Sequence, residues 1–263
     1  MSKTIMSTAR SAWALWGAQW RTLWRSKRLL ILAALFALLG LANPLTAELT
    51  PTLLKSTIGG AQLAQLIPDP DSVSSWAQFY KSMTQLGIYL LAIFFSNMIS
   101  QEVSAGTLVN LVTKGLPRPT LIAVKYCSAL SQWMLSILLA FSITWGYTLY
   151  YFPDRHSPHP LVALLPLLAF GIFFIAVIAF GSSLGHSPYS GLLVLVIVQA
   201  GLMILNTFEQ AKRFNPISLI SDNMSLLQGQ EQLSHVLPAF IVSLGASAFL
   251  LASSTLILNH KRL

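Results

Sequence analysis

Residues 161–185 read LVALLPLLAFGIFFIAVIAFGSSLG and contain no charged side chain. A helix of about 20 apolar residues is long enough to cross the hydrocarbon core of a bilayer. Apolar residues run through these stretches without the regular polar alternation of membrane β-barrel strands, so we expect helices. The sequence therefore predicts an all-α integral membrane protein whose single transmembrane domain covers 1–263. Its six predicted spans are 29–47, 83–100, 126–151, 161–185, 189–208 and 236–258.

The composition of the whole chain agrees with this class of protein. Of the 263 residues, 54% are hydrophobic and only 9% are charged, whereas soluble domains average about 25% charged residues. The spans use about half of the chain, so no soluble domain of useful size remains. The net charge of +8 would suggest nucleic acid in a soluble protein. In a membrane protein its distribution matters more, and we expect no nucleic-acid partner.

The distribution of charge predicts the orientation of the chain. Six crossings place both termini on one side, and the inner segments then hold eleven Lys and Arg residues with Glu102 as their only acid. The outer segments 48–82, 152–160 and 209–235 hold five basic and seven acidic residues. Cytoplasmic loops carry an excess of Lys and Arg. We therefore expect a multi-pass protein of the cell membrane with both termini in the cytoplasm.

Residues 7–28, before the first span, form an amphipathic segment. Its tryptophans recur at helical spacing, and its arginines gather on an adjoining strip. Such a helix lies in the membrane interface, with its rings at headgroup depth and its cations against anionic lipid. It is either a simple anchor or an anchor that also touches a cytoplasmic partner. The residues that define it are Trp13, Trp16, Trp20, Arg21, Trp24 and Arg25.

The spans lack the groups that most intramembrane chemistry requires. Their central portions contain no Asp, Glu, Lys or Arg, which argues against a proton-coupled carrier, an intramembrane protease or a charge-lined channel. No phosphate-binding loop or hydrolase motif occurs, so we expect a non-enzymatic chain whose energy comes from another subunit. Polar uncharged side chains form either an interhelical seam, which we favour, or a lined pathway. They are Gln85, Asn97, Gln132, Gln199 and Asn206.

Two smaller motifs carry weaker signals. Gly181 and Gly185 form a G-x-x-x-G pattern, which permits close helix packing or simply marks a helix end. His156 and His159 lie three apart in a proline-rich outer loop. With no Cys or carboxylate cluster nearby beyond Asp154, a solvated turn is favoured over a metal site, and we predict no metal ligands.

The inner loop between the second and third spans is the most informative stretch. Residues 100–125 read SQEVSAGTLVNLVTKGLPRPTLIAVK. The apolar positions predict a short helix over 102–113, which Gly115 and Pro117 end. A short amphipathic helix between two turns can dock into a groove of a partner, or it can be a plain interfacial loop.

This loop resembles that of the type-2 ABC exporter permeases. In that family an acid at the end of the second span is followed by G-T-L, further leucines, a step containing proline and arginine, and a lysine at the third span. In ABC importer permeases the glycine follows the glutamate by six positions, whereas here it follows by four. The matching residues are Glu102, Gly106, Thr107, Leu108, Leu111, Pro117, Arg118 and Lys125.

The resemblance implies a permease without its own ATPase. Two such chains, identical or homologous, would work with two copies of a separate ABC ATPase subunit that binds ATP and Mg. The loop 101–118 would hold the helix that couples ATPase closure to the spans. The resemblance and the apolar spans favour export of a hydrophobic or amphipathic peptide, lipid or drug, with antimicrobial-peptide export or immunity as the leading expectation. The alternative is a non-transporting membrane anchor or scaffold for an ABC ATPase.

Overall fold

The computed structural model describes residues 13, 16–22, 25, 27–55, 70–101, 117–154, 156–185 and 187–260. All regular structure within these residues is helical, as predicted for an all-α protein. The elements are α2 (Arg28–Lys55), α4 (Ser72–Ser82), the π-helix η1 (Met83–Gly87), α5 (Ile88–Phe95), α8 (Arg118–Tyr151), α9 (Pro160–Leu184), α10 (Ser190–Leu205), α11 (Glu209–Lys212), α12 (Ser218–Ser221), α13 (Asn223–Leu227) and α14 (Leu233–His260).

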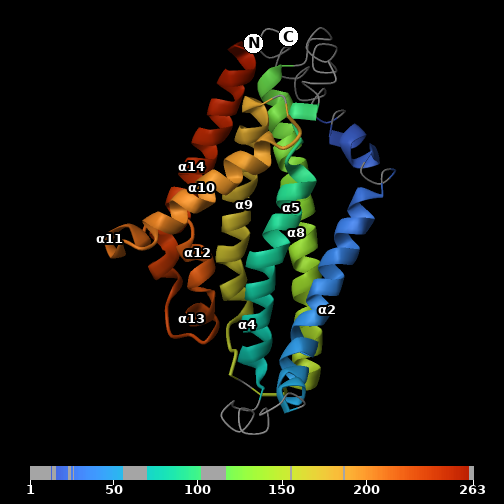
Figure 1. The fold of residues 1–263 in the computed structure, drawn as a ribbon, viewed down its shortest axis with the longest axis vertical. Helices are drawn as coiled ribbons and strands as arrows, with labels where there is room; N and C mark the ends of the chain where they lie inside the picture. Colours follow the sequence, from blue (N-terminus) through green and yellow to red (C-terminus); the bar gives the residue numbers. More distant parts are fainter. Residues whose placement is uncertain are drawn as a thin grey trace.

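The long helices run up and down the long axis of the molecule (Figure 1). Helix α2 begins at the same end of the bundle where α8 begins and where α9 and α14 finish. The N-terminus of α4, the end of α8 and the start of α9 meet at the opposite end. The described helices therefore place the flanks of segment 102–116 at one end and the loop 152–160 at the other.

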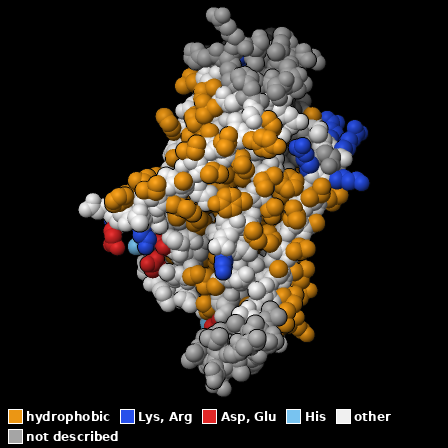
Figure 2. Space-filling model, in the orientation of Figure 1, with side chains coloured by type: hydrophobic (Ala, Val, Ile, Leu, Met, Phe, Trp, Pro, Cys, Tyr) orange, Lys and Arg blue, Asp and Glu red, His pale blue; other side chains and the backbone are white. Residues whose placement is uncertain are grey.

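Four of the described helices are long and apolar enough to cross a membrane. They are Arg28–Thr50, Arg118–Tyr151, Pro160–Leu184 and Leu233–Asn259. Large apolar side chains stay exposed on their outward faces, for example Leu38 at 65% and Phe249 at 71%. Figure 2 shows apolar side chains spread over much of the visible face. A water-facing surface of this kind is unfavourable, so the described surface indicates a protein embedded in a membrane.

The predicted spans 83–100 and 189–208 correspond to more irregular helices. Residues 72–95 are helical throughout, and the π-helix η1 lies between the α-helical segments α4 and α5. A π-helix widens one turn and commonly marks a functional position in an α-helix. Helix α10 has 16 residues, which is shorter than the usual crossing length. It also slopes across the bundle, while its neighbour α9 runs along the long axis (Figure 1).

Several helix boundaries differ from the prediction: α2 ends eight residues after the predicted span, α4 begins eleven residues before the next one, and α8 begins eight residues before the third. Pro117 has extended backbone angles, and Arg118 and Pro119 form the first turn. Proline is well tolerated in the first turn of a helix because its missing N–H would have no intrahelical partner there. Arg118 and Lys125 therefore lie within α8 and not in a loop that leads to it.

Helix α9 occupies the centre of the bundle. About 72% of its most apolar stretch is buried, against 22% for α14 and 28% for α2. It packs against α14, α10, α8 and the short helices α12 and α13. Gly171 admits the ring of Trp133 from α8, and Gly181 lies close to Gly191 and Val194 of α10. Small residues thus let α9 approach its neighbours on two sides.

The G-x-x-x-G pattern at the end of α9 serves both of its expected roles. A Cβ at Gly181 would lie 2.7 Å from the Cβ of Val194, so that glycine permits close packing. Gly185 follows the last residue of α9 in an extended conformation and ends the helix.

The N-terminal segment is helical at Trp13, 16–22 and Arg25. Lys27 then adopts a left-handed backbone conformation with φ of 55° before α2 begins. A single left-handed residue is a common way to end a helix. The chain therefore bends between the amphipathic segment and α2 (Figure 1).

Candidate functional site

Two predicted coupling residues hold α8 to its neighbours at the end of the bundle where α8 begins. The guanidinium of Arg118 donates a hydrogen bond to the carbonyl oxygen of Leu258, near the end of α14. The ammonium Nζ of Lys125 donates to the carbonyl oxygen of Met98, 2.6 Å away in the turn after α5. These contacts connect both flanks of segment 102–116 to the bundle, since Met98 precedes it and Arg118 follows it. Charged donors make the stronger class of hydrogen bond.

A cavity of about 110 Å³ lies beside Lys125. One water needs about 10–15 Å³ of cavity volume, so several waters or a small polar group would fit. Ser128 lines the cavity and is 1% exposed, and its Oγ has no hydrogen-bond partner among the described residues. The other lining residues combine cations, amides and apolar side chains: Gln19, Arg28, Phe94, Phe95, Asn97, Met98, Gln101, Lys125, Ala129 and Gln132.

The five polar residues predicted in the spans do not line one path through the described part of the chain. Asn97 and Gln132 meet at the cavity, and Gln132 Nε2 donates to the Ser128 carbonyl within α8. Gln85 is exposed on η1. Gln199 faces the contact between α9 and α10, where its Oε1 is buried and no residue in the described part of the chain hydrogen-bonds to it. Asn206 Oδ1 accepts a weak hydrogen bond from Asn215 at 3.4 Å after the end of α10.

The residues of the N-terminal amphipathic segment lie next to the end of the bundle where α8 begins (Figure 1). Trp13 is 75% exposed, and the rings of Trp16 and Trp20 are 6.2 Å apart. Arg21 and Arg25 are exposed. Figure 2 shows Lys and Arg side chains gathered on this side of the molecule. This arrangement of rings and cations suits the headgroup region of a bilayer.

Several predicted site residues lie outside the described residues. They are Trp24 of the interfacial segment and Glu102, Gly106, Thr107, Leu108 and Leu111 of the inner loop. The predicted coupling helix over 102–113 therefore stays a prediction.

The opposite end of the bundle carries a carboxylate cluster at the N-terminus of α4. Asp71 caps this helix, since its Oδ1 accepts from the backbone N–H of Ser74 at 2.8 Å. Asp154 arrives from the loop after α8 and accepts from the backbone N–H and the hydroxyl of Ser72. His156 Nδ1 lies 3.6 Å from Asp71 and 3.9 Å from Asp154. The imidazole is largely exposed.

Hydrogen bonds control the ionisation of Asp154. Partial burial opposes its charged form, but the Ser72 hydroxyl, the Ser72 and His156 backbone N–H groups and the nearby imidazole together lower the pKa of this carboxyl. A carboxylate at a helix N-terminus also interacts favourably with the helix dipole. The charged form of Asp154 therefore attaches the loop after α8 to the start of α4.

Asp154→Asn is expected to destabilise the protein at pH 7 by about 1–3 kcal/mol, because hydrogen bonds to a charged group are lost. The lowered folded-state pKa makes this contribution present above the ordinary carboxyl range near pH 4 and lost as pH falls through the folded value. Thermal unfolding in detergent at pH 7 and at pH 3 measures both effects. Glu209→Gln, at an exposed acid on α11, is the control. An equal difference between wild type and Asp154→Asn at both pH values would contradict this role.

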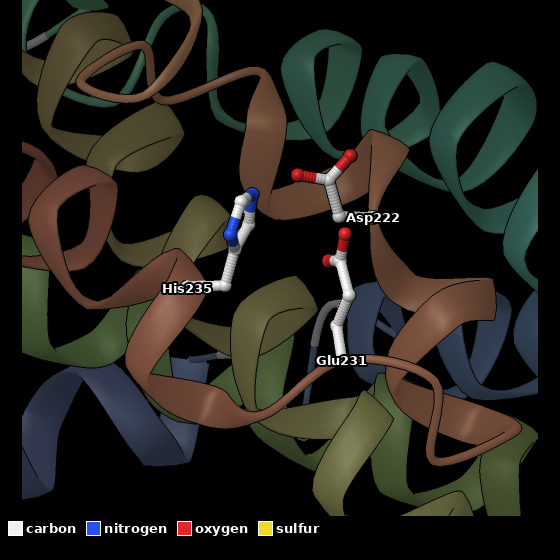
Figure 3. Close-up of side chains that lie close together, drawn as sticks. All are labelled: Asp222, Glu231 and His235. Carbon is white, nitrogen blue, oxygen red and sulfur yellow. The ribbon is translucent and has the colours of Figure 1, made fainter.

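A second polar cluster lies in the excursion between α10 and α14. Asp222, Glu231 and His235 point toward one another (Figure 3), and their ligand atoms lie within 4.8 Å of one another. The sequence alone pointed to His156 and His159 as the candidate metal ligands and did not reveal this group. The available signal was the pair Glu231 and His235, four residues apart, with Glu231 just before α14 and His235 in its first turn. Asp222 is nine residues before Glu231 in the chain, so only the fold adds it.

Comparison of the chain with protein-family models, curated proteins and solved structures found no match.

Proposed function

We propose that this chain is the membrane-spanning permease subunit of an ATP-driven ABC exporter. It would cross the cell membrane six times, with both termini in the cytoplasm, and would move a hydrophobic or amphipathic cargo outward. The pattern from Glu102 to Lys125 is the observation that carries this proposal. The ATPase, with its ATP and Mg, would be a separate subunit.

The contacts of Arg118 and Lys125 support a mechanical role for the inner loop. A force on segment 102–116 would reach α5 and α8 directly through its two flanks. It would also reach α14 through the hydrogen bond from Arg118 to the Leu258 carbonyl. The bond from Lys125 to Met98 keeps the two flanks together. Coupling requires such a rigid connection, because a partner can bias the spans only through contacts that differ between its states.

The size of the cavity supports a pathway that is shared between two chains. Pockets that enclose a drug-sized ligand measure about 300–1,000 Å³, and the cavity beside Lys125 holds about 110 Å³. Peptide, lipid or drug cargo would therefore need a pathway outside this cavity. The outward face of α8 keeps large apolar residues exposed, including Leu135 at 51% and Tyr150 at 80%. A second permease chain would cover part of such a face and enclose a larger space.

The proposal is tested first by purifying the protein from its native membrane in mild detergent and identifying what accompanies it. We expect an ATPase subunit with a Walker phosphate loop. Glu102→Ala and Leu108→Pro are expected to remove that partner, or at least to abolish coupled ATP hydrolysis, while the protein remains inserted. Glu102→Asp keeps the charge and is the matched control. Recovery of the protein alone, with both loop variants inert, would overturn the permease proposal.

A transport assay separates the exporter from the scaffold. Inverted vesicles that contain the complex are supplied with ATP and with labelled amphipathic peptide, lipid or drug. ATP-dependent uptake that Leu108→Pro abolishes is the expected result. A complex that hydrolyses ATP through an intact loop but moves none of these cargo classes would favour a membrane anchor for the ATPase.

A further inference from the structure

We propose that Asp222, Glu231 and His235 form a binding site for a divalent transition metal, with zinc as the best-suited ion. The three side chains come from the end of α12, from the loop after α13 and from the first turn of α14. Their ligand atoms lie within 4.8 Å of one another, and Figure 3 shows the two carboxylates and the imidazole converging. This site is independent of the proposed export function.

The electrostatics of the cluster favour a cation. Glu231 Oε2 is buried, and none of the described residues shares a hydrogen bond with it. Asp222 Oδ1 accepts a hydrogen bond from the neighbouring Ser221 hydroxyl, at 2.8 Å. A buried carboxylate oxygen without a donor is costly, and a second carboxylate beside it adds repulsion. A bound divalent cation would remove both penalties.

Local backbone structure aims Glu231 at the cluster. Gly229 adopts φ of +71°, a left-handed conformation that reverses the chain after α13. The backbone N–H groups of Gln230 and Glu231 then both donate to the carbonyl oxygen of Ser225, at 2.9 and 3.3 Å. These bonds fix the turn before α14 begins. The backbone that carries the Glu231 side chain is therefore held in a structured turn.

The donor set selects the class of metal. Zinc takes imidazole nitrogen and carboxylate oxygen at about 2.0–2.2 Å, which places neighbouring ligand atoms about 3.3 Å apart in a tetrahedral site. The observed group needs only a small closure of side chains to reach that geometry. Calcium and magnesium prefer oxygen ligands alone, so His235 would not contribute to their binding. Three protein ligands leave the fourth position of a tetrahedral zinc site open for water. His235 is exposed, so water can reach the site.

The experiment titrates zinc into the full-length protein in detergent, without a polyhistidine tag and after chelator treatment, by calorimetry. Wild type is expected to bind one zinc ion at micromolar concentration and to gain thermal stability. Asp222→Asn, Glu231→Gln and His235→Ala are each expected to weaken binding by at least about tenfold. His156→Ala is the matched control, because it removes a histidine that lies beside two other carboxylates. Its zinc affinity is expected to equal that of wild type.

Cobalt provides a second readout that depends on the imidazole. Bound Co²⁺ is expected to give a visible absorption band that His235→Ala removes and His156→Ala retains. Glu231→Gln keeps the shape of the side chain, so its unfolding midpoint without metal is expected to equal or exceed that of wild type. Absence of zinc binding, binding that His235→Ala leaves unchanged, or binding that His156→Ala abolishes would each overturn the proposal. Calcium binding as tight as zinc binding would also overturn it.

Discussion

Gly171→Ala is expected to destabilise the protein by about 3 kcal/mol, although alanine is normally the better residue inside a helix. A Cβ at this position would lie 2.0 Å from Trp133 Nε1 and 2.2 Å from Cε2. The tryptophan is fully buried and packs edge-on against Phe36, with ring centroids 6.4 Å apart. Because the ring is fully buried, it can turn away only if its neighbours also move. The added methyl group is therefore expected to disturb the packing of α8 against α9.

The measurement is the midpoint of thermal unfolding in detergent. The midpoint is expected to fall by about 6–12 °C, since 1 kcal/mol corresponds to roughly 2–4 °C in a protein of this size class. Gly245→Ala on α14 is the control, because a Cβ there meets nothing within 4 Å. Trp133→Leu should partly rescue Gly171→Ala, because it removes the ring that the methyl group meets. Additive losses in the double variant would show that the ring is not the obstacle.

Gly191→Ala is expected to lower the free energy of unfolding at least as much as Gly171→Ala. The added Cβ would meet backbone atoms, so no second side-chain substitution can restore the packing. A Cβ at Gly191 would lie 2.5 Å from the carbonyl oxygen of Ser96 and 3.0 Å from that of Ile178. Both obstacles are backbone atoms, one after α5 and one within α9. Since backbone cannot rotate away, α10 must move as a unit. We expect a loss of about 3 kcal/mol or more, with poor recovery of folded protein.

Gly201→Ala is the matched control on the same helix, because a Cβ there meets nothing within 4 Å. Helix propensity alone makes it neutral or stabilising by up to about 1 kcal/mol. Unfolding midpoints and the fraction of monodisperse protein after purification distinguish the two variants. Equal behaviour of Gly191→Ala and Gly201→Ala would show that α10 is not held against α5 and α9 as described.

Gly191 packs next to the turn that forms part of the proposed coupling site. Gly191 contacts the carbonyl oxygen of Ser96, two residues before the Met98 carbonyl that accepts from Lys125. The packing of α10 therefore supports the turn that Lys125 holds. A variant at Gly191 that still folds is expected to weaken coupling as well as stability.

Sequence reasoning placed the helices better than it placed their ends. The span predicted at 161–185 corresponds to α9 over Pro160–Leu184, because a charge-free apolar run has no other low-energy structure in a bilayer. The start of α8 at Arg118 was missed by eight residues. There the boundary depends on Pro117 and Pro119, and hydropathy does not detect it. The crossing of the membrane at 83–100 and 189–208 remains a prediction, as does the coupling helix.

The amino-acid sequence alone predicted the helices and apolar spans that the described residues show, because the bilayer imposes a length and a hydropathy that can be read locally. It also located the basic residues Arg118 and Lys125. Only the tertiary structure decided which groups meet: Asp154 with Ser72, 82 residues away, Gly171 with Trp133, and Asp222 with Glu231 and His235. Such contacts depend on how helices pack and where turns reverse the chain. No local pattern of residues encodes that packing by itself.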